Sequence, residues 1–229
     1  MSRALFWECP HPSCGFRFPE VGPQAALPAA RTCPRCGTPL RLVAQISLPG
    51  EAPPPPSPAS PHPLPPPHPG ARLGVLDNLR SAWNVGSIFR SADGAGWAHV
   101  ALAGFSPDPT HPGVAKTALG AERHLPWSRH LNAVRLVQRL KAQGWLIWAL
   151  ETHPQAVPLQ PGQAMGVQGA PLALVVGNEQ AGVDPGVLEL CHRVVALPMR
   201  GLKRSLNVAV AFAVAAYLLA PPGGDRASS

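Results

Sequence analysis

The sequence lacks a hydrophobic run long enough to cross a membrane. Its longest apolar run, residues 208–220, is well short of the ~20 residues that a bilayer-spanning helix needs. Residues 1–8 also lack the cationic start and the long apolar core of a secretory signal peptide. We therefore expect a soluble, cytoplasmic protein with no membrane partner.

Acidic side chains are scarce. Asp and Glu together number 12 against 19 Lys and Arg, which leaves a formal net charge of +7. Such a surplus of positive charge says nothing about fold, but it favours a polyanionic partner. Nucleic acid is the leading candidate.

No internal repeat is present, and no G-x-G-x-x-G follows the first expected strand, which argues against an ordinary dinucleotide site. From residue 72 onward, short β-branched runs alternate with amphipathic stretches. Strands are expected at 72–76, 100–105, 145–150, 172–176 and 193–197, and helices at 85–95, 130–142, 185–191 and from 205 onward. This alternation predicts an α/β fold with a mostly parallel sheet and helices on both faces, in which ligands bind beyond the carboxyl ends of the strands.

Four of the five cysteines fall within the first 36 residues, as the pairs Cys9-x4-Cys14 and Cys33-x2-Cys36. In a reducing cytosol this pattern favours a metal over disulfides, because two such knuckles offer four thiolates to a tetrahedral Zn²⁺. A segment of this size also has too small a hydrophobic core to fold without a bound metal or another cross-link. The first pair is spaced more widely than usual, so His11 stays open as an alternative ligand.

Proline supplies eleven of the seventeen residues from 53 to 69, so this stretch cannot pack a core and predicts an extended linker. His62 and His68 within it are interpreted as solvated side chains. We expect a zinc-ribbon-like domain at 1–50, the linker at 51–70, the α/β domain at 71–222 and a disordered tail at 223–229.

Three polar clusters each follow an expected strand, so all three are expected at the carboxyl edge of the sheet. They are Asn84-x-Gly86-x-x-x-Arg90, Gly177-Asn178-Glu179-x-x-Gly182, and Leu197-Pro198-Met199-x-Gly201 followed by Ser205-Leu206-Asn207-Val208. Asn84 and Ser205 are expected to cap the helices that follow them. The third cluster also carries Arg200, Lys203 and Arg204, which indicate a phosphate-bearing partner unless the segment is a plain turn with solvated cations.

In this order and spacing, the three motifs resemble the SpoU (TrmH) family of SPOUT RNA 2′-O-methyltransferases, from about Leu73 to Leu219. The resemblance implies a C-terminal trefoil knot, S-adenosylmethionine bound in it, a homodimer with the site at its interface, and methyl transfer to a ribose 2′-hydroxyl of tRNA or rRNA. It implies a catalytic group of Asn84, Arg90, Glu179, Ser205 and Asn207. It also implies cofactor contacts, largely through the backbone, from Gly177, Leu197, Met199 and Leu206.

Arg90 is interpreted as an electrostatic element and not as a base, because a guanidinium keeps its proton up to a pKa above ~12. It would hold a phosphate next to the target ribose and stabilise the developing alkoxide. The alternatives are a salt bridge on the helix flank for Arg90 and a loop-organising cap for Glu179. Three other functions stay open: a SPOUT base-nitrogen methyltransferase, a non-catalytic RNA-binding module and a nicotinamide-dependent enzyme.

Overall fold

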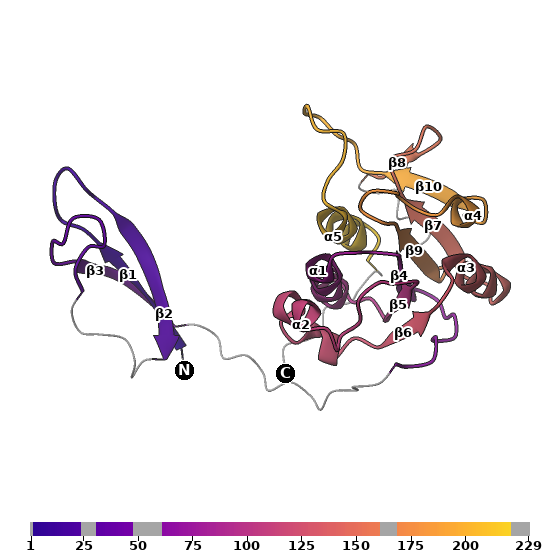
Figure 1. Ribbon diagram of the computed structural model, residues 1–229, viewed down its shortest axis with the longest axis horizontal. Helices are drawn as coiled ribbons and strands as arrows, with labels where there is room; N and C mark the ends of the chain where they lie inside the picture. The colour runs from indigo at the N-terminus through magenta and orange to yellow at the C-terminus, as the bar shows by residue number, and fades with distance from the viewer. Residues whose placement is uncertain (1, 24–30, 48–60, 161–168, 221–229) are drawn as a thin grey trace. The chain divides into compact units, whose positions relative to one another are not determined.

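The computed structural model describes residues 2–23, 31–47, 61–160 and 169–220, and the chain divides into two compact units, Met1–Pro53 and Pro54–Ser229 (Figure 1). Half of the predicted linker and the whole predicted tail lie outside the described residues. Residues 161–168 also lie outside the described residues. The trefoil knot stays a prediction. No helix within the described ranges is long and apolar enough to span a bilayer.

The N-terminal unit is a three-stranded antiparallel sheet in the order β2-β1-β3. The strands are β1 (Ser2–Glu8), β2 (Arg17–Pro23) and β3 (Arg41–Ser47). The central strand buries Leu5 and Trp7, and the Trp7 indole nitrogen donates to Glu20 across the sheet at 3.2 Å. Among the described residues of this unit few large side chains are buried, so the described core is small and needs a further source of stability.

The second unit contains a seven-stranded sheet in the order β6-β5-β4-β9-β7-β10-β8, and every neighbouring pair in it is parallel. Its strands are β4 (Arg72–Asp77), β5 (His99–Ala103), β6 (Trp127–His130), β7 (Leu146–Leu150), β8 (Val157–Pro158), β9 (Leu172–Val176) and β10 (Arg193–Ala196). The predicted fold class, a mostly parallel α/β sheet, is confirmed.

Helices pack on both faces of this sheet (Figure 1). They are α1 (Ala82–Gly94), α2 (Pro112–Ala118), α3 (Ala133–Ala142), α4 (Pro185–Leu188) and α5 (Val208–Leu218), with a short 3₁₀ turn at Ala121–Arg123. Helices α1, α2 and α5 share one apolar cluster with the sheet, and α3 and α4 share the other. The alternation within β4 explains the division, because Leu76 lies in the first cluster and Val75 in the second.

Helix α5 lies close against the sheet through Phe212. A Cβ added at Gly74 of β4 would approach the Phe212 ring to 3.3 Å, so the absence of a side chain there makes room for the ring. The other side of α5 is not covered by any residue that the structure describes, since Val210, Val214 and Tyr217 are 50%, 42% and 62% exposed. The apolar sequence predicts a helix buried all round, and among the described residues of one chain that prediction is wrong.

Two predicted helix starts are also wrong. Helix α1 begins at Ala82 and its N-cap is Ser81, whose hydroxyl accepts from the amide of Asn84, the residue predicted as the cap. Helix α5 is capped by Asn207 and not by Ser205, because the Asn207 side-chain oxygen accepts from the amides of residues 209 and 210.

The predicted helix over 130–142 begins only at Ala133, and the preceding residues form the edge strand β6. That strand is four residues long and includes Ser128, Arg129 and His130, so it has no apolar run from which it could be predicted. Part of the predicted linker packs against the same strand. The His62 amide donates to the Trp127 carbonyl at 2.6 Å and His62 is half-buried, which corrects the expectation that it is solvated.

Candidate active site

The loops that follow β7, β9 and β10 enclose a cleft of about 500 Å³ at the carboxyl edge of the sheet. Its lining comprises residues 150–152, 176–180, 182, 196–197, 199, 204–208 and 211. A cleft of this size is typical of small-molecule sites. All four predicted cofactor residues line it, namely Gly177, Leu197, Met199 and Leu206.

A chain of hydrogen bonds joins the three sequence motifs at the rim of this cleft. The Asn207 side-chain amide donates to the Asn84 side-chain oxygen at 3.1 Å, and the Asn84 amide donates to Glu179 at 2.9 Å. Each of these residues begins or follows a different element: α5, α1 and β9. The structure therefore brings together three of the five predicted catalytic residues. Two of these three, Asn84 and Asn207, are 123 residues apart in the sequence.

The Glu179 carboxylate also caps the start of α1. Its two oxygens accept from the backbone amides of Arg80 and Ser81 at 2.9 and 3.1 Å. Partial burial acts to raise the pKa of Glu179, but the hydrogen bonds from Arg80, Asn84 and Ser81 outweigh it, and the pKa lies below its ordinary value. Glu179 is therefore ionised at neutral pH and is a weak base.

The turn that carries Glu179 is fixed by its own short hydrogen bonds. Asn178 and Gly182 exchange backbone hydrogen bonds of 3.0 and 2.9 Å, and the Asn178 side chain donates to the carbonyl of Asn78 at 2.7 Å. A Cβ at Gly177 would lie 2.2 Å from the backbone of Gly182, so only glycine fits. Gly182 has a φ of +75°, which glycine adopts without strain.

Glu151 is a cleft residue that the sequence motifs do not include. It follows β7, and its carboxylate accepts from the amides of Thr152 at 2.8 Å and Val183 at 2.9 Å. The second bond ties the end of β7 to the turn after β9. Its position directly after an expected strand, at the ligand-binding edge of the sheet, was the signal that could have identified it.

Arg90 and Ser205 are the two predicted catalytic residues outside the hydrogen-bond chain. Ser205 lines the cleft and is exposed. Arg90 is exposed on α1, does not line the cleft, and forms no hydrogen bond or ion pair with any residue that the structure describes. The salt-bridge interpretation of Arg90 therefore finds no partner there, and its guanidinium is free to bind an anion.

The loop before α5 presents its cations to solvent. Arg200, Lys203 and Arg204 are all exposed, and Leu202 between them is fully exposed. None of the three cations forms an ion pair within the described part of the chain. Arg204 also lines the cleft, so this positive loop extends from the cleft rim into solvent.

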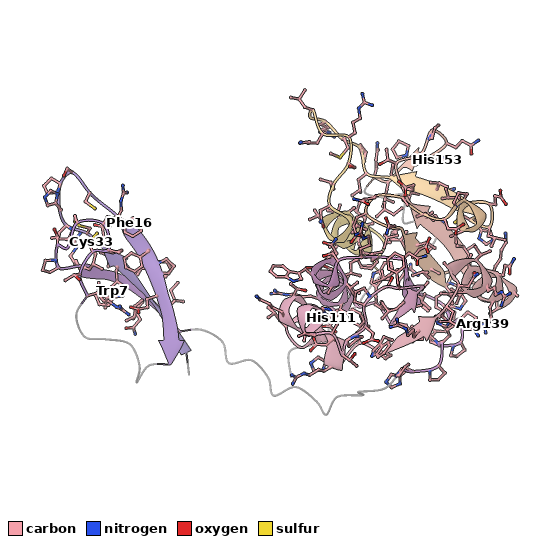
Figure 2. All side chains as sticks on the ribbon, in the orientation of Figure 1. Trp7, Phe16, Cys33, His111, Arg139 and His153 are labelled. Atoms are coloured by element: carbon pink, nitrogen blue, oxygen red, sulfur yellow. The ribbon has the colours of Figure 1, made fainter. Side chains whose placement is uncertain are left out.

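The four N-terminal cysteines form a second candidate site, in the other unit. Their sulfur atoms all lie within 4.8 Å of one another, and the Cys9–Cys36 and Cys14–Cys33 pairs are 3.4 and 3.7 Å apart (Figure 2). Zinc–sulfur bonds of ~2.3 Å in a tetrahedron require sulfur atoms about 3.8 Å apart, so the cluster can hold Zn²⁺. His11 is not part of the cluster and bonds instead to Ser13.

Comparisons with known proteins match the second unit of the chain. The sequence model of the SpoU rRNA Methylase family matches residues 73–217. The 23S rRNA (guanosine(2553)-2′-O)-methyltransferase RlmP of Bacillus subtilis is 34% identical over 145 residues, 63% of this chain and 56% of that protein. The 23S rRNA (guanosine-2′-O-)-methyltransferase RlmB of Vibrio parahaemolyticus is 33% identical over 144 residues, 62% of this chain and 56% of that protein.

A solved structure with the same fold is the AdoMet-bound rRNA methyltransferase from Sinorhizobium meliloti. It matches with a TM-score of 0.61 at 27% identity, over 67% of this chain and 57% of that chain. The chain thus spans little more than half the length of the relatives it matches. Because the family match covers well over half of its residues and includes all three motifs, the chain belongs to the SpoU methylase family.

Proposed function

We propose that this chain transfers a methyl group from S-adenosylmethionine to a ribose 2′-hydroxyl of RNA. The observation that carries the proposal is the hydrogen-bond chain from Asn207 through Asn84 to Glu179, because it gathers all three family motifs at one cleft. The names of the two curated relatives make a guanosine of 23S rRNA the first substrate to test. A tRNA substrate is the second.

The cleft fits the cofactor in shape and chemistry. Its lining includes the apolar residues Leu197, Leu206 and Val208, which suit a purine ring, and the turn at Gly177 presents backbone in place of a side chain. Glu151 and Glu179 supply hydrogen-bond acceptors at its edge. When bound, S-adenosylmethionine supplies an electrophilic methyl group on a sulfonium.

The residues of the chain position the ribose. A direct displacement needs the nucleophilic oxygen about 3 Å from the methyl carbon, so much of the rate enhancement comes from holding the ribose in place. Asn84 is fixed between Glu179 and Asn207 and is the group best held to orient the hydroxyl. Glu179 is a weak base, so its role is to hold Asn84 and the start of α1, and the hydroxyl proton passes to solvent.

Arg90 and the exposed cations bind the RNA backbone. Arg90 has no partner among the described residues, and its planar guanidinium suits a phosphate next to the target ribose. Arg200, Lys203 and Arg204 extend the positive surface from the rim of the cleft. The N-terminal unit, with one Zn²⁺ bound by its four cysteines, is the second RNA-binding element of the proposal.

A homodimer is part of the same proposal. Val210, Val214 and Tyr217 form an exposed apolar stripe along one side of α5, and α1 packs beside that helix. A second copy of the chain would cover this stripe and place the dimer interface beside the cleft. A cytoplasmic location follows from an rRNA or tRNA substrate and is proposed with it.

The proposal is tested by incubating the purified protein with methyl-labelled S-adenosylmethionine and total RNA from cells that lack it. We expect label in RNA, and we expect calorimetry to show binding of S-adenosylmethionine but not of NAD. Absence of both transfer and cofactor binding would refute the proposal. Cofactor binding without transfer would favour a non-catalytic RNA-binding module.

A further inference from the structure

Two carboxylates line the cleft, and they differ in how their charge is compensated. Glu179 faces the start of α1, where three N–H donors and the positive end of the helix dipole offset its charge. Among the described residues, Glu151 accepts from two backbone N–H groups, one in a loop and one in a turn. No ion pair reaches Glu151 from any residue that the structure describes.

The cation that lines the cleft among the described residues does not cancel that charge. Arg204 lines the same cleft, but it is exposed and forms no ion pair with either carboxylate in the described part of the chain. Glu151 is held on both oxygens, one by Thr152 and one by Val183, so it cannot swing away to solvent without breaking two hydrogen bonds. The cleft therefore has a fixed negative wall at the end of β7.

We propose that Glu151 is a specificity-determining residue that selects the positively charged cofactor over its neutral product. This inference rests on the proposed function, because it assumes that the cleft receives S-adenosylmethionine. A fixed carboxylate in a cleft that excludes part of the solvent attracts a sulfonium more strongly than it would in water. After the methyl group leaves with its charge, the remaining thioether is neutral, this attraction is lost, and product release becomes easier.

Glu151 also has a structural role, which has a different signature. Its bond to Val183 ties β7 to the turn after β9, and a Cβ at Gly182 would come within 2.6 Å of the same carboxylate. Losing this tie would loosen the turn that carries Glu179 and weaken the binding of every ligand to a similar degree. If Glu151 acts by its charge, removing that charge should weaken only the binding of cationic ligands.

The test uses Glu151→Gln in the full chain and three ligands: S-adenosylmethionine, S-adenosylhomocysteine and sinefungin, which carries an ammonium in place of the methylsulfonium. Calorimetry should show the affinity for the two cationic ligands falling about five- to tenfold. The affinity for the neutral S-adenosylhomocysteine should change less than twofold. Glu189→Gln is the matched control, because it removes the same charge from an exposed residue outside the cleft and should leave all three affinities unchanged.

The possible outcomes distinguish a failure of charge selection by Glu151 from a failure of the proposed function. Equal loss for all three ligands in Glu151→Gln, or no loss for any, would overturn charge selection while leaving the proposed function intact. Failure of the parent chain to bind either S-adenosylmethionine or S-adenosylhomocysteine would instead refute the proposed function. Urea unfolding of the ligand-free variant detects a loosened turn independently of binding.

Discussion

Replacing Glu179 by glutamine removes a charge from the point where the three motifs meet. The carboxylate accepts from two backbone amides and from Asn84, and a glutamine has only one oxygen with which to replace it. The second position becomes an amide donor that faces a backbone N–H. The start of α1 loses both a hydrogen bond and a favourable charge at the positive end of its dipole.

The expected loss of stability is modest, because Glu179 is exposed. Hydrogen bonds to charged groups contribute on the order of 1.5 to 3 kcal/mol, and screening by solvent reduces this to about 1 kcal/mol at an exposed site. A loss of that size lowers the Tm of a unit this large by roughly 2 to 4 °C. Methyl transfer should fall much further, since Asn84 loses the partner that orients it.

The stability difference between Glu179→Gln and the parent should also depend on pH. Hydrogen bonds lower the folded-state pKa of Glu179, so its contribution is fully present above the unfolded pKa of ~4.3 and is lost as the pH falls through the folded value. The two proteins should therefore converge in strong acid and differ at pH 7.

Urea unfolding followed by tryptophan fluorescence measures this difference, because five of the six tryptophans lie in the second unit. Glu189→Gln, which changes the same charge at an exposed position after α4, is the control. A difference that persists unchanged at low pH, or that is absent at pH 7, would refute the capping role of Glu179.

Four further predictions concern other parts of the chain. Arg90→Ala should change the free energy of unfolding by less than ~0.5 kcal/mol and leave cofactor affinity unchanged, while single-turnover methyl transfer falls ~10²- to 10³-fold. Arg90→Lys should restore little of the lost rate. Transfer near the parent rate would contradict the catalytic assignment. Gly177→Ala should abolish cofactor binding in calorimetry, because its Cβ would overlap the backbone of Gly182; binding at parent affinity would show that the turn yields. Cys33→Ser should lose about one Zn²⁺ per chain, as measured by elemental analysis, and should unfold only the N-terminal unit. The Tm of the second unit should stay unchanged in calorimetric scans. Tyr217→Arg should shift the mass in light scattering from dimer to monomer, and a dimer that survives would place the interface elsewhere.

The sheet and the cleft could be predicted from sequence because their signals are local. The strands at 72–77 and 172–176 contain the short apolar runs 73–76 and 172–176, and the turn after the second strand carries two glycines that its geometry requires. The four cysteines gather as their spacing predicts. Each of these features depends on residues close together in the chain.

The features that the sequence did not reveal depend on distant contacts. Strand β6 is polar and exists because it pairs with β5, and the proline segment at His62 packs only because that edge strand is present. Asn84 looks like a cap by its position, yet it is held by Glu179 and Asn207, which lie about 95 and 123 residues away. The tie from Glu151 to Val183 likewise becomes visible only in three dimensions, whereas the cap at Ser81 is a local feature, and the prediction of Asn84 in its place is wrong.

The central claim is that the chain methylates the ribose of RNA at its 2′-hydroxyl, and nucleoside analysis of its product tests this most directly. RNA from cells lacking the protein would be methylated in vitro with 23S rRNA and tRNA kept separate, then digested and examined by mass spectrometry. The account predicts a nucleoside whose added methyl group stays with the sugar when the base is released, together with a phosphodiester that resists alkali at the modified position. A methyl group that leaves with the base would contradict it.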